Sequence, residues 1–153
     1  GGDQLLVVTG GYGYTFNLTT NTLSYITDGD FPQGQALMCA FLDGYGLVLV
    51  ANSAQFQWSA LEDFTSWDAL DVAEKSQTSD YLMALVVDID RKVIWLIGSQ
   101  NTELWWDSGN ADQPFEPVPN ALVSQGAASS FGFARARTGR AWRWRGRAPT
   151  PRG

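Results

Sequence analysis

An internal repeat constrains this chain more than any other feature, because a repeated sequence folds into repeated structural units. Each copy consists of an apolar run, a short polar turn and an aromatic segment. The copies are Leu5–Gly11 with Tyr14–Phe16, Leu47–Ser53 with Phe56–Trp58, and Trp95–Asn101 with Leu104–Trp106. The second copy begins 42 residues after the first, and the third begins 48 residues after the second. The chain is therefore expected to be an array of similar units.

The pattern within each copy is that of short β-strands. Four consecutive apolar residues in each first run predict a strand buried on both faces, and the alternation in each aromatic segment predicts one buried face. Further apolar strands, at residues 38–42 and 82–87, precede the second and third copies. The joining residues, Asp43–Gly46 and Asp88–Lys92, have hairpin chemistry.

A unit of this length with about four short strands has the size of one β-propeller blade. The predicted fold class is all-β, a β-propeller-like repeat of about three blades within residues 1–131, with units of about 5–35, 36–80 and 81–126. Closed propellers need roughly four to eight blades. We therefore expect a fragment of a larger propeller, or a chain that oligomerises to cover its exposed blade edges.

Two segments depart from the strand pattern. Residues Trp67–Glu74, with Ser66 as the N-cap, are predicted to form one or two helical turns, although their helix propensity is modest. After the third copy, Pro114, Pro117 and Pro119 exclude a central strand between them, because proline has no N–H to donate to a second neighbour.

Composition excludes most hydrolytic chemistry. The chain has no histidine and one cysteine, so it contains no Ser-His-Asp triad, no Cys-His dyad, no Cys/His zinc site and no disulfide within the chain. Cys39 lies in an apolar run and is expected to be a buried, inert thiol. No apolar run is long enough to cross a membrane, so a soluble protein is expected. We expect no enzymatic activity, no cofactor and no bound metal.

Three pairs of acidic residues are candidates for a catalytic pair of carboxylates. A pair of carboxylates serves glycoside hydrolysis, and some propellers are glycosidases. The pairs Asp28/Asp30, Glu62/Asp63 and Asp88/Asp90 lie in predicted turns, where Asp and Glu cap the backbone and face solvent. Turn capping is the better interpretation of all three.

Core or blade-to-blade packing is the default interpretation of the tryptophans, and Trp105 on the third unit is the best candidate for an exposed one. Trp106 continues the aromatic alternation and is expected to point inward, so its neighbour Trp105 is expected to point outward. Trp105, Glu103 and Asp107 are therefore the candidate surface or interface residues. An exposed tryptophan beside carboxylates favours an alternative function, a carbohydrate-binding or carbohydrate-cleaving β-propeller.

Charge is distributed unevenly along the chain. All sixteen acidic residues lie between Asp3 and Glu116, whereas residues 132–153 form an Arg-rich segment without strand periodicity. Three interpretations remain open for this tail: an out-of-frame reading of a GC-rich gene, a disordered tail, or a nucleic-acid-binding arm. The arm would use Arg143, Arg145, Trp142 and Trp144 for phosphate contacts and base stacking.

An ordered series of sequence blocks resembles the packaged DNA stabilisation protein family of short-tailed phages, also described as tail hub or tail accessory factors. The resemblance covers roughly Met38 to Gly126 and extends weakly back to Leu5, and the Arg-rich end departs from it. The blocks are Phe56–Asp63, Trp67–Glu74, Gly98–Trp105, Asp107–Gly109 and Pro114–Phe115.

The resemblance implies a structural role in the virion tail, with no catalytic residues to carry over. Such a protein attaches below the portal ring after packaging, closes the DNA channel and forms a platform for later tail proteins. The expected partners are the portal, other tail proteins and further copies in a ring, with synthesis in the host cytoplasm. Packaged DNA is expected nearby, without specific nucleic-acid binding, and an acidic surface suits such a channel.

Overall fold

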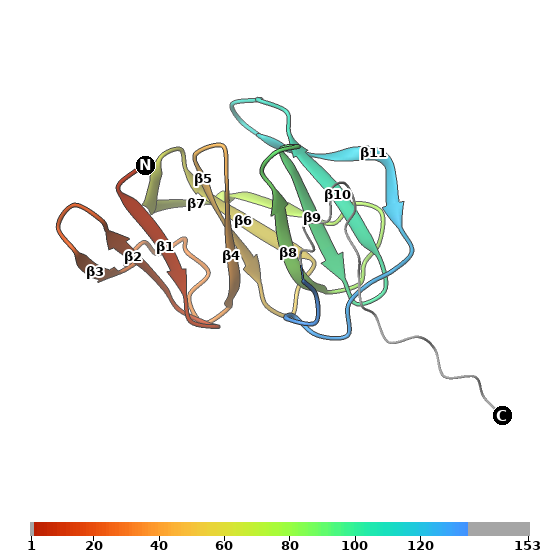
Figure 1. Ribbon diagram of the computed structural model, residues 1–153, viewed down its shortest axis with the longest axis horizontal. Helices are drawn as coiled ribbons and strands as arrows, with labels where there is room; N and C mark the ends of the chain where they lie inside the picture. The colour runs from red at the N-terminus through yellow and green to blue at the C-terminus, as the bar shows by residue number, and fades with distance from the viewer. Residues whose placement is uncertain (1, 135–153) are drawn as a thin grey trace.

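A computed structural model describes residues 2–134, and all regular secondary structure in that range is β-strand. The strands form three antiparallel sheets that follow one another across the molecule in chain order (Figure 1). In each sheet, strands that are consecutive in sequence are hydrogen-bonded neighbours. The predicted all-β fold class is confirmed.

The strands have the following bounds. The first sheet contains β1 (Gln4–Val8), β2 (Gly13–Asn17) and β3 (Thr22–Tyr25). The second sheet contains β4 (Ala36–Leu42), β5 (Tyr45–Val50), β6 (Gln55–Ala60) and β7 (Asp63–Glu74). The third sheet contains β8 (Leu82–Asp88), β9 (Val93–Gly98), β10 (Thr102–Asp107) and β11 (Phe115–Val123).

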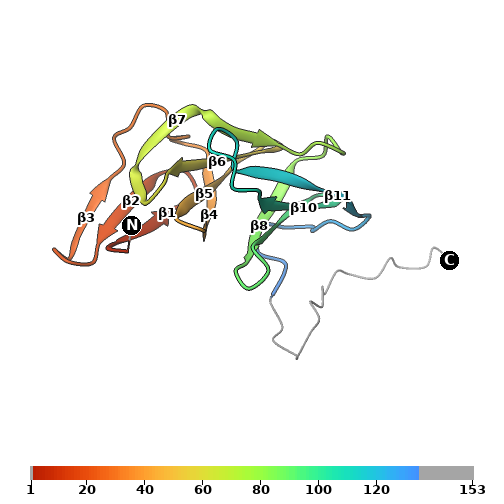
Figure 2. The same ribbon diagram turned by 90° about the horizontal axis from the view of Figure 1, so that it is seen from above.

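The connections between sheets follow one rule. The chain leaves the first sheet from β3 and enters the second at β4, and it leaves the second from β7 and enters the third at β8. Strand β4 contacts both β1 and β8, so these three strands lie on the same side of the array. Seen from above, the second sheet lies between the other two (Figure 2).

Tight hairpins set the register where the sequence predicts them. Asp43 and Gly44 join β4 to β5, and both have positive φ angles, 47° and 92°. Two consecutive positive φ angles give a turn whose twist matches that of the flanking strands. The longer join between β8 and β9 also ends on a positive φ, at Lys92. Both predicted hairpins are confirmed.

The larger core lies between the second and third sheets. Leu47 and Leu49 of β5, with Phe56 and Trp58 of β6, point from the second sheet toward this core. Phe115 lies against both aromatic rings, with edge-on ring centroids 6.0 Å from Phe56 and 5.4 Å from Trp58. Edge-to-face aromatic pairs add to the stability that area burial alone provides.

A smaller core joins the first and second sheets. Val48, between Leu47 and Leu49 on β5, points to this opposite face, where it packs with Ile26, Phe31 and Trp67. All three β5 residues are fully buried. The expectation that this apolar run is covered on both faces is therefore confirmed for β5, because a sheet packs against each side of it.

The predicted helix at Trp67–Glu74 is wrong, because these residues form the second half of strand β7. Gln57 and Phe56 of β6 pair with Val72 and Ala73. Ser66 is not an N-cap; the Trp67 N–H donates instead to Asp28 Oδ2 at 3.0 Å. The local helix preference is modest, so pairing with β6 and burial of Trp67 determine the conformation.

The prolines lie where the sequence predicts. Pro117 and Pro119 fall within β11, which pairs only with β10 and forms the outer edge of the third sheet. A proline is tolerated there because its missing N–H faces no second strand.

Candidate functional site

The predicted surface residues of β10 lie at an interface inside the molecule. Glu103 and Trp105 point toward the second sheet, and their exposed fractions are 0% and 4%. Trp105 packs edge-on against Phe56, with ring centroids 5.6 Å apart. Trp106 is the exposed residue, at 43%. The prediction of an outward Trp105 and an inward Trp106 is therefore wrong.

The reason for the error is the position of the third sheet in the array. The two tryptophans do face opposite ways, as alternation along a strand requires. The second sheet covers the face that carries Trp105, whereas no further sheet within residues 2–134 covers the face of Trp106. Periodicity gives the two faces of a strand, but only the neighbouring sheets decide which face is buried.

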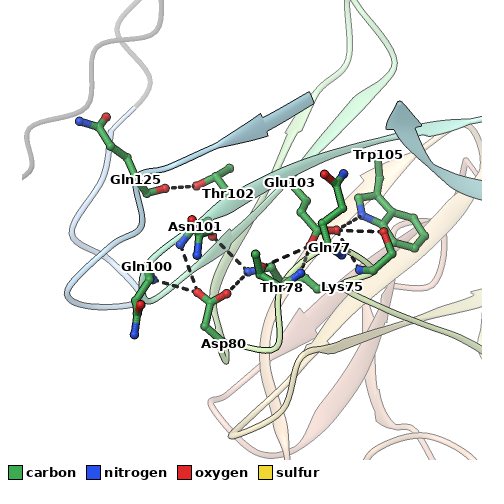
Figure 3. Close-up of polar contacts among 11 residues, drawn as sticks. Lys75, Gln77, Thr78, Asp80, Gln100, Asn101, Thr102, Glu103, Trp105 and Gln125 are labelled. Carbon is green, nitrogen blue, oxygen red and sulfur yellow. Dashed lines mark hydrogen bonds and ion pairs between the residues drawn. The ribbon is translucent and has the colours of Figure 1, made fainter. Parts of the chain in front are cut away.

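Glu103 anchors the segment that links the second sheet to the third (Figure 3). Its Oε1 accepts hydrogen bonds from the backbone N–H groups of Gln77 and Thr78, at 2.9 and 3.1 Å, and its Oε2 accepts one from Ser76 at 2.9 Å. The Trp105 indole N–H also donates to Oε2, at 3.2 Å. Burial raises the pKa of Glu103, but these hydrogen bonds outweigh burial, and the net pKa is lowered.

A buried ion pair holds the two ends of the same linking segment. Lys75 Nζ lies 2.5 Å from Asp80 Oδ1, and the exposed fractions of the two side chains are 0% and 9%. Lys75 also donates to the Asn101 carbonyl, while Asp80 Oδ2 accepts from the N–H groups of Gln100 and Asn101. Burial raises the pKa of Asp80, yet Lys75 and these hydrogen bonds bring it well below its usual range.

We call Lys75, Asp80 and Glu103, with the backbone of residues 76–78 and 100–101, the inter-sheet clamp. Its carboxylates are surrounded by donors and closed off from solvent, so they are placed for structural hydrogen bonding rather than for proton transfer to a substrate. No sequence motif indicates this clamp, because Asp80 and Glu103 accept most of their hydrogen bonds from residues twenty or more positions away.

Acidification is expected to destabilise the protein through the clamp. The pKa values of Asp80 and Glu103 lie below their ordinary values of 3.8 and 4.5. A carboxylate with a lowered pKa contributes stability above its ordinary pKa, and that contribution is lost as the pH falls through its folded-state pKa. The free energy of unfolding, from urea titrations, should therefore decrease below about pH 4.5. Asp80→Asn should make this decrease shallower, and an unchanged slope would contradict the assignment.

Asp28 and Asp63 cap turns as the sequence predicts, whereas Asp88 does not face solvent, because it is the last residue of β8 and is buried. Asp28 Oδ1 accepts the Asp30 N–H at 3.0 Å, and Asp63 Oδ1 accepts the Thr65 N–H at 2.9 Å. Asp88 is fully buried and pairs with Arg91 at 2.7 Å.

The remaining candidate residues lie at the end of a strand, within a strand, or outside the described part of the chain. Asp107 ends β10, is half-buried and accepts the Gly109 N–H at 2.8 Å; an interface role for it stays a prediction. Cys39 is half-buried, and burial raises the pKa of its thiol, which disfavours the reactive thiolate. Arg143, Arg145, Trp142 and Trp144 of the predicted nucleic-acid arm lie outside the described residues.

Residues 2–134 contain no group of three or more His, Cys, Asp or Glu side chains placed to hold a metal ion. The same residues include no helix with the length and apolar character to cross a membrane.

Apolar faces remain open at both ends of the array. On the first sheet, two cross-strand rows face away from the second sheet. The rows are Leu5–Phe16–Leu23 and Val7–Tyr14–Tyr25, and Leu5, Leu23 and Tyr25 are 53%, 60% and 44% exposed. On the third sheet, Trp106 is exposed on the corresponding outer face.

The chain is similar to one known family. The model of a family described as bacteriophage P22 Gp10, beta-propeller, matches residues 1–148. The matched range extends at both ends beyond residues 38–126, on which the resemblance in sequence blocks rests. A search of curated proteins found no match.

A solved structure shares the fold. The crystal structure of the N-terminal domain of Nup159 aligns with a TM-score of 0.50 at 14% sequence identity. The alignment covers 82% of this chain and 29% of that chain. At this identity the likeness is one of fold alone. With the family match and the three consecutive sheets, it confirms the predicted β-propeller class.

Proposed function

The chain belongs to the bacteriophage P22 Gp10 β-propeller family of phage DNA-stabilisation proteins, and from this premise we propose that it is a non-enzymatic component of the virion tail. In this proposal it attaches below the portal and helps to retain packaged DNA. The observation that carries the proposal is the family match over residues 1–148.

The charge of the folded region supports a position near DNA without tight binding. Sixteen acidic residues precede position 135, against only three basic ones, Lys75, Arg91 and Lys92. Protein binding to the DNA backbone depends on lysine and arginine contacts with phosphates. An acidic wall beside a channel repels the duplex and lets it pass.

The side-chain contacts support a structural role. Glu103 and Asp80 are occupied by hydrogen bonds within the clamp, and Asp28 and Asp63 cap turns. These contacts hold strands and linkers in place, which suits a structural subunit. The open apolar faces of the first and third sheets support contacts with other tail proteins or with further copies of the chain.

The alternative function, a carbohydrate-binding or carbohydrate-cleaving β-propeller, lacks the exposed tryptophan that it requires. It required an exposed Trp105 beside a carboxylate cleft, and Trp105 is buried between two sheets. No other observation favours it.

Reconstitution of DNA-filled heads tests the proposal. Heads of the encoding phage, assembled without this protein, are expected to lose DNA and to retain more of it after the purified chain is added. The measurement is the DNase-resistant DNA per head, together with sedimentation of the chain with the heads.

Heads assembled without the portal provide the matched control, because the chain should not sediment with them. Equal sedimentation with both kinds of head would contradict attachment at the portal. Sedimentation without any change in DNase-resistant DNA would contradict the retention role.

A further inference from the structure

The two ends of the sheets differ in charge. One end, which we call the charged end, is formed by the turns after β4, β6, β8 and β10, at residues 43–44, 61–62, 89–92 and 108–114. Figure 1 shows these turns along the upper side of the molecule. Their charged side chains, with those of the adjoining strand ends, are Asp43, Glu62, Asp63, Asp90, Arg91, Lys92, Asp107 and Asp112.

The opposite end, which we call the neutral end, is formed mainly by uncharged segments. These are residues 9–12, 33–35, 51–54, 76–81, 99–101 and 124–127. Asp80 lies within them, but its carboxylate is paired with Lys75 in the clamp. Glu74, at the end of β7, is exposed beside them. Within residues 2–134, no lysine or arginine is exposed at this end, because Lys75 is buried and the other two basic residues lie in the turn after β8.

Backbone hydrogen bonds join the segments of the neutral end to one another. They run from the first sheet across the second to the third. The donor and acceptor residues are Ala36 and Gly11, Ala51 and Gln35, Leu82 and Ser53, Ser99 and Tyr81, and Ala127 and Gly98, at distances of 2.8–3.2 Å. A surface held in this way needs little ordering when a partner binds, so little free energy of binding is lost to ordering it.

The exposed side chains of the neutral end are those of a protein contact surface. Tyr12 and Tyr81 are 52% and 62% exposed, and Tyr81 lies in the link between the second and third sheets. Exposed glutamines accompany them, at positions 35, 77, 100 and 125. The cores of protein–protein interfaces are enriched in tyrosine and depleted in charged residues. A tyrosine buries an apolar ring while its hydroxyl keeps a hydrogen bond.

Charge decides which partner fits this surface. A nucleic acid needs lysine and arginine contacts with its phosphates, and the described part of the neutral end exposes neither. A basic protein would be attracted to the carboxylates of the charged end instead. A protein surface with few charges covers the neutral end without removing water from many ionised groups, whereas burial of the charged end would carry that cost.

We propose that the chain docks onto the portal vertex of the DNA-filled head through the neutral end, against a protein surface poor in charged residues. The charged end then points away from the contact. This inference rests on the proposed function and adds to it the surface by which the chain attaches. Tyr81 is expected to contribute most, because tyrosine is common among the few residues that dominate the free energy of an interface.

Cosedimentation of the full chain with DNA-filled heads tests this surface. Tyr81→Asp places a charge at the neutral end, on a side chain that is 62% exposed, so the variant should fold. Half-saturation of the heads should then need at least about tenfold more chain. Tyr81→Gln keeps the surface uncharged and should retain most of the binding.

Ile89→Asp is the matched control, because Ile89 is 63% exposed and lies in a turn of the charged end. This variant should saturate the heads at the wild-type concentration. Urea titrations of both aspartate variants, followed by tryptophan fluorescence, should give the wild-type midpoint. The effect of Tyr81→Asp is then one of contact and not of folding.

The outcomes separate this inference from the function on which it rests. If the wild-type chain does not sediment with portal-containing heads, both fail. If it does, and Tyr81→Asp sediments equally well or Ile89→Asp is the variant that loses binding, only the neutral end is wrong.

Two further outcomes would assign the contact to another occupant and overturn the inference. One is loss of wild-type binding when salt rises from about 0.1 to about 1 M, which would indicate a contact between charges, such as those of the Arg-rich residues 135–153. The other is a dimer of the chain alone that Tyr81→Asp dissociates while head binding stays unchanged. That result would assign the neutral end to a second copy.

Discussion

Glu103→Ala is expected to lower the free energy of unfolding by about 4 kcal/mol, a large share of the roughly 5–15 kcal/mol that a domain has. The substitution removes the acceptor for the backbone N–H groups of Ser76, Gln77 and Thr78 and for the Trp105 indole. Donors left buried without a partner carry their full desolvation cost. Urea denaturation followed by tryptophan fluorescence measures the loss.

Glu74→Ala is the matched control for this prediction. Glu74 lies on β7 at the end of the second sheet and is exposed, so its removal should change the free energy of unfolding by less than about 0.5 kcal/mol. A loss of similar size in the two variants would mean that the clamp does not hold the linking segment. Selective acceleration of amide exchange at residues 76–78 in Glu103→Ala would support the local assignment.

Trp105→Ala is expected to cost about 4 kcal/mol, whereas Trp106→Ala should cost less than about 1 kcal/mol. Trp105 is 4% exposed and packs against Phe56 in the core between the second and third sheets. Its truncation leaves a cavity and also removes one donor to Glu103. Trp106 is 43% exposed, and its side chain leaves no closed cavity when it is removed.

This pair of variants tests the orientation of the third sheet directly. The two residues are adjacent and of the same type, so composition and unfolded-state effects largely cancel between them. Equal losses, or a larger loss for Trp106→Ala, would show that a further layer of protein covers the outer face of the third sheet in solution. The same urea titrations measure both variants.

The repeat and the hairpins could be predicted because their signals are local. Apolar runs, Gly-containing turns and the Asp43-Gly44 pair depend on residues a few positions apart, and the structure has strands and positive φ angles there. The missing N–H of proline was enough to exclude a central strand there, and the strand that contains Pro117 and Pro119 is at the edge of its sheet. These features depend on the covalent chemistry of each residue and its near neighbours.

The helix predicted at Trp67–Glu74 does not form, because strand pairing with the distant β6 outweighs a weak local helix preference. Pairing with β6 supplies backbone hydrogen bonds to the segment and buries Trp67. Neither the position of β6 nor the contact with Asp28 is visible in the eight residues themselves.

The all-β class, the repeating units and the two faces of each strand could be predicted from the residues alone, because period and turn chemistry are properties of short segments. The packing of the sheets buries Trp105 rather than Trp106 and brings Glu103 to the backbone of residues 76–78, and neither could be predicted from a short segment. The physical reason is that burial and hydrogen-bond satisfaction depend on which sheets lie on either side, and that arrangement is set by contacts between residues far apart in the chain.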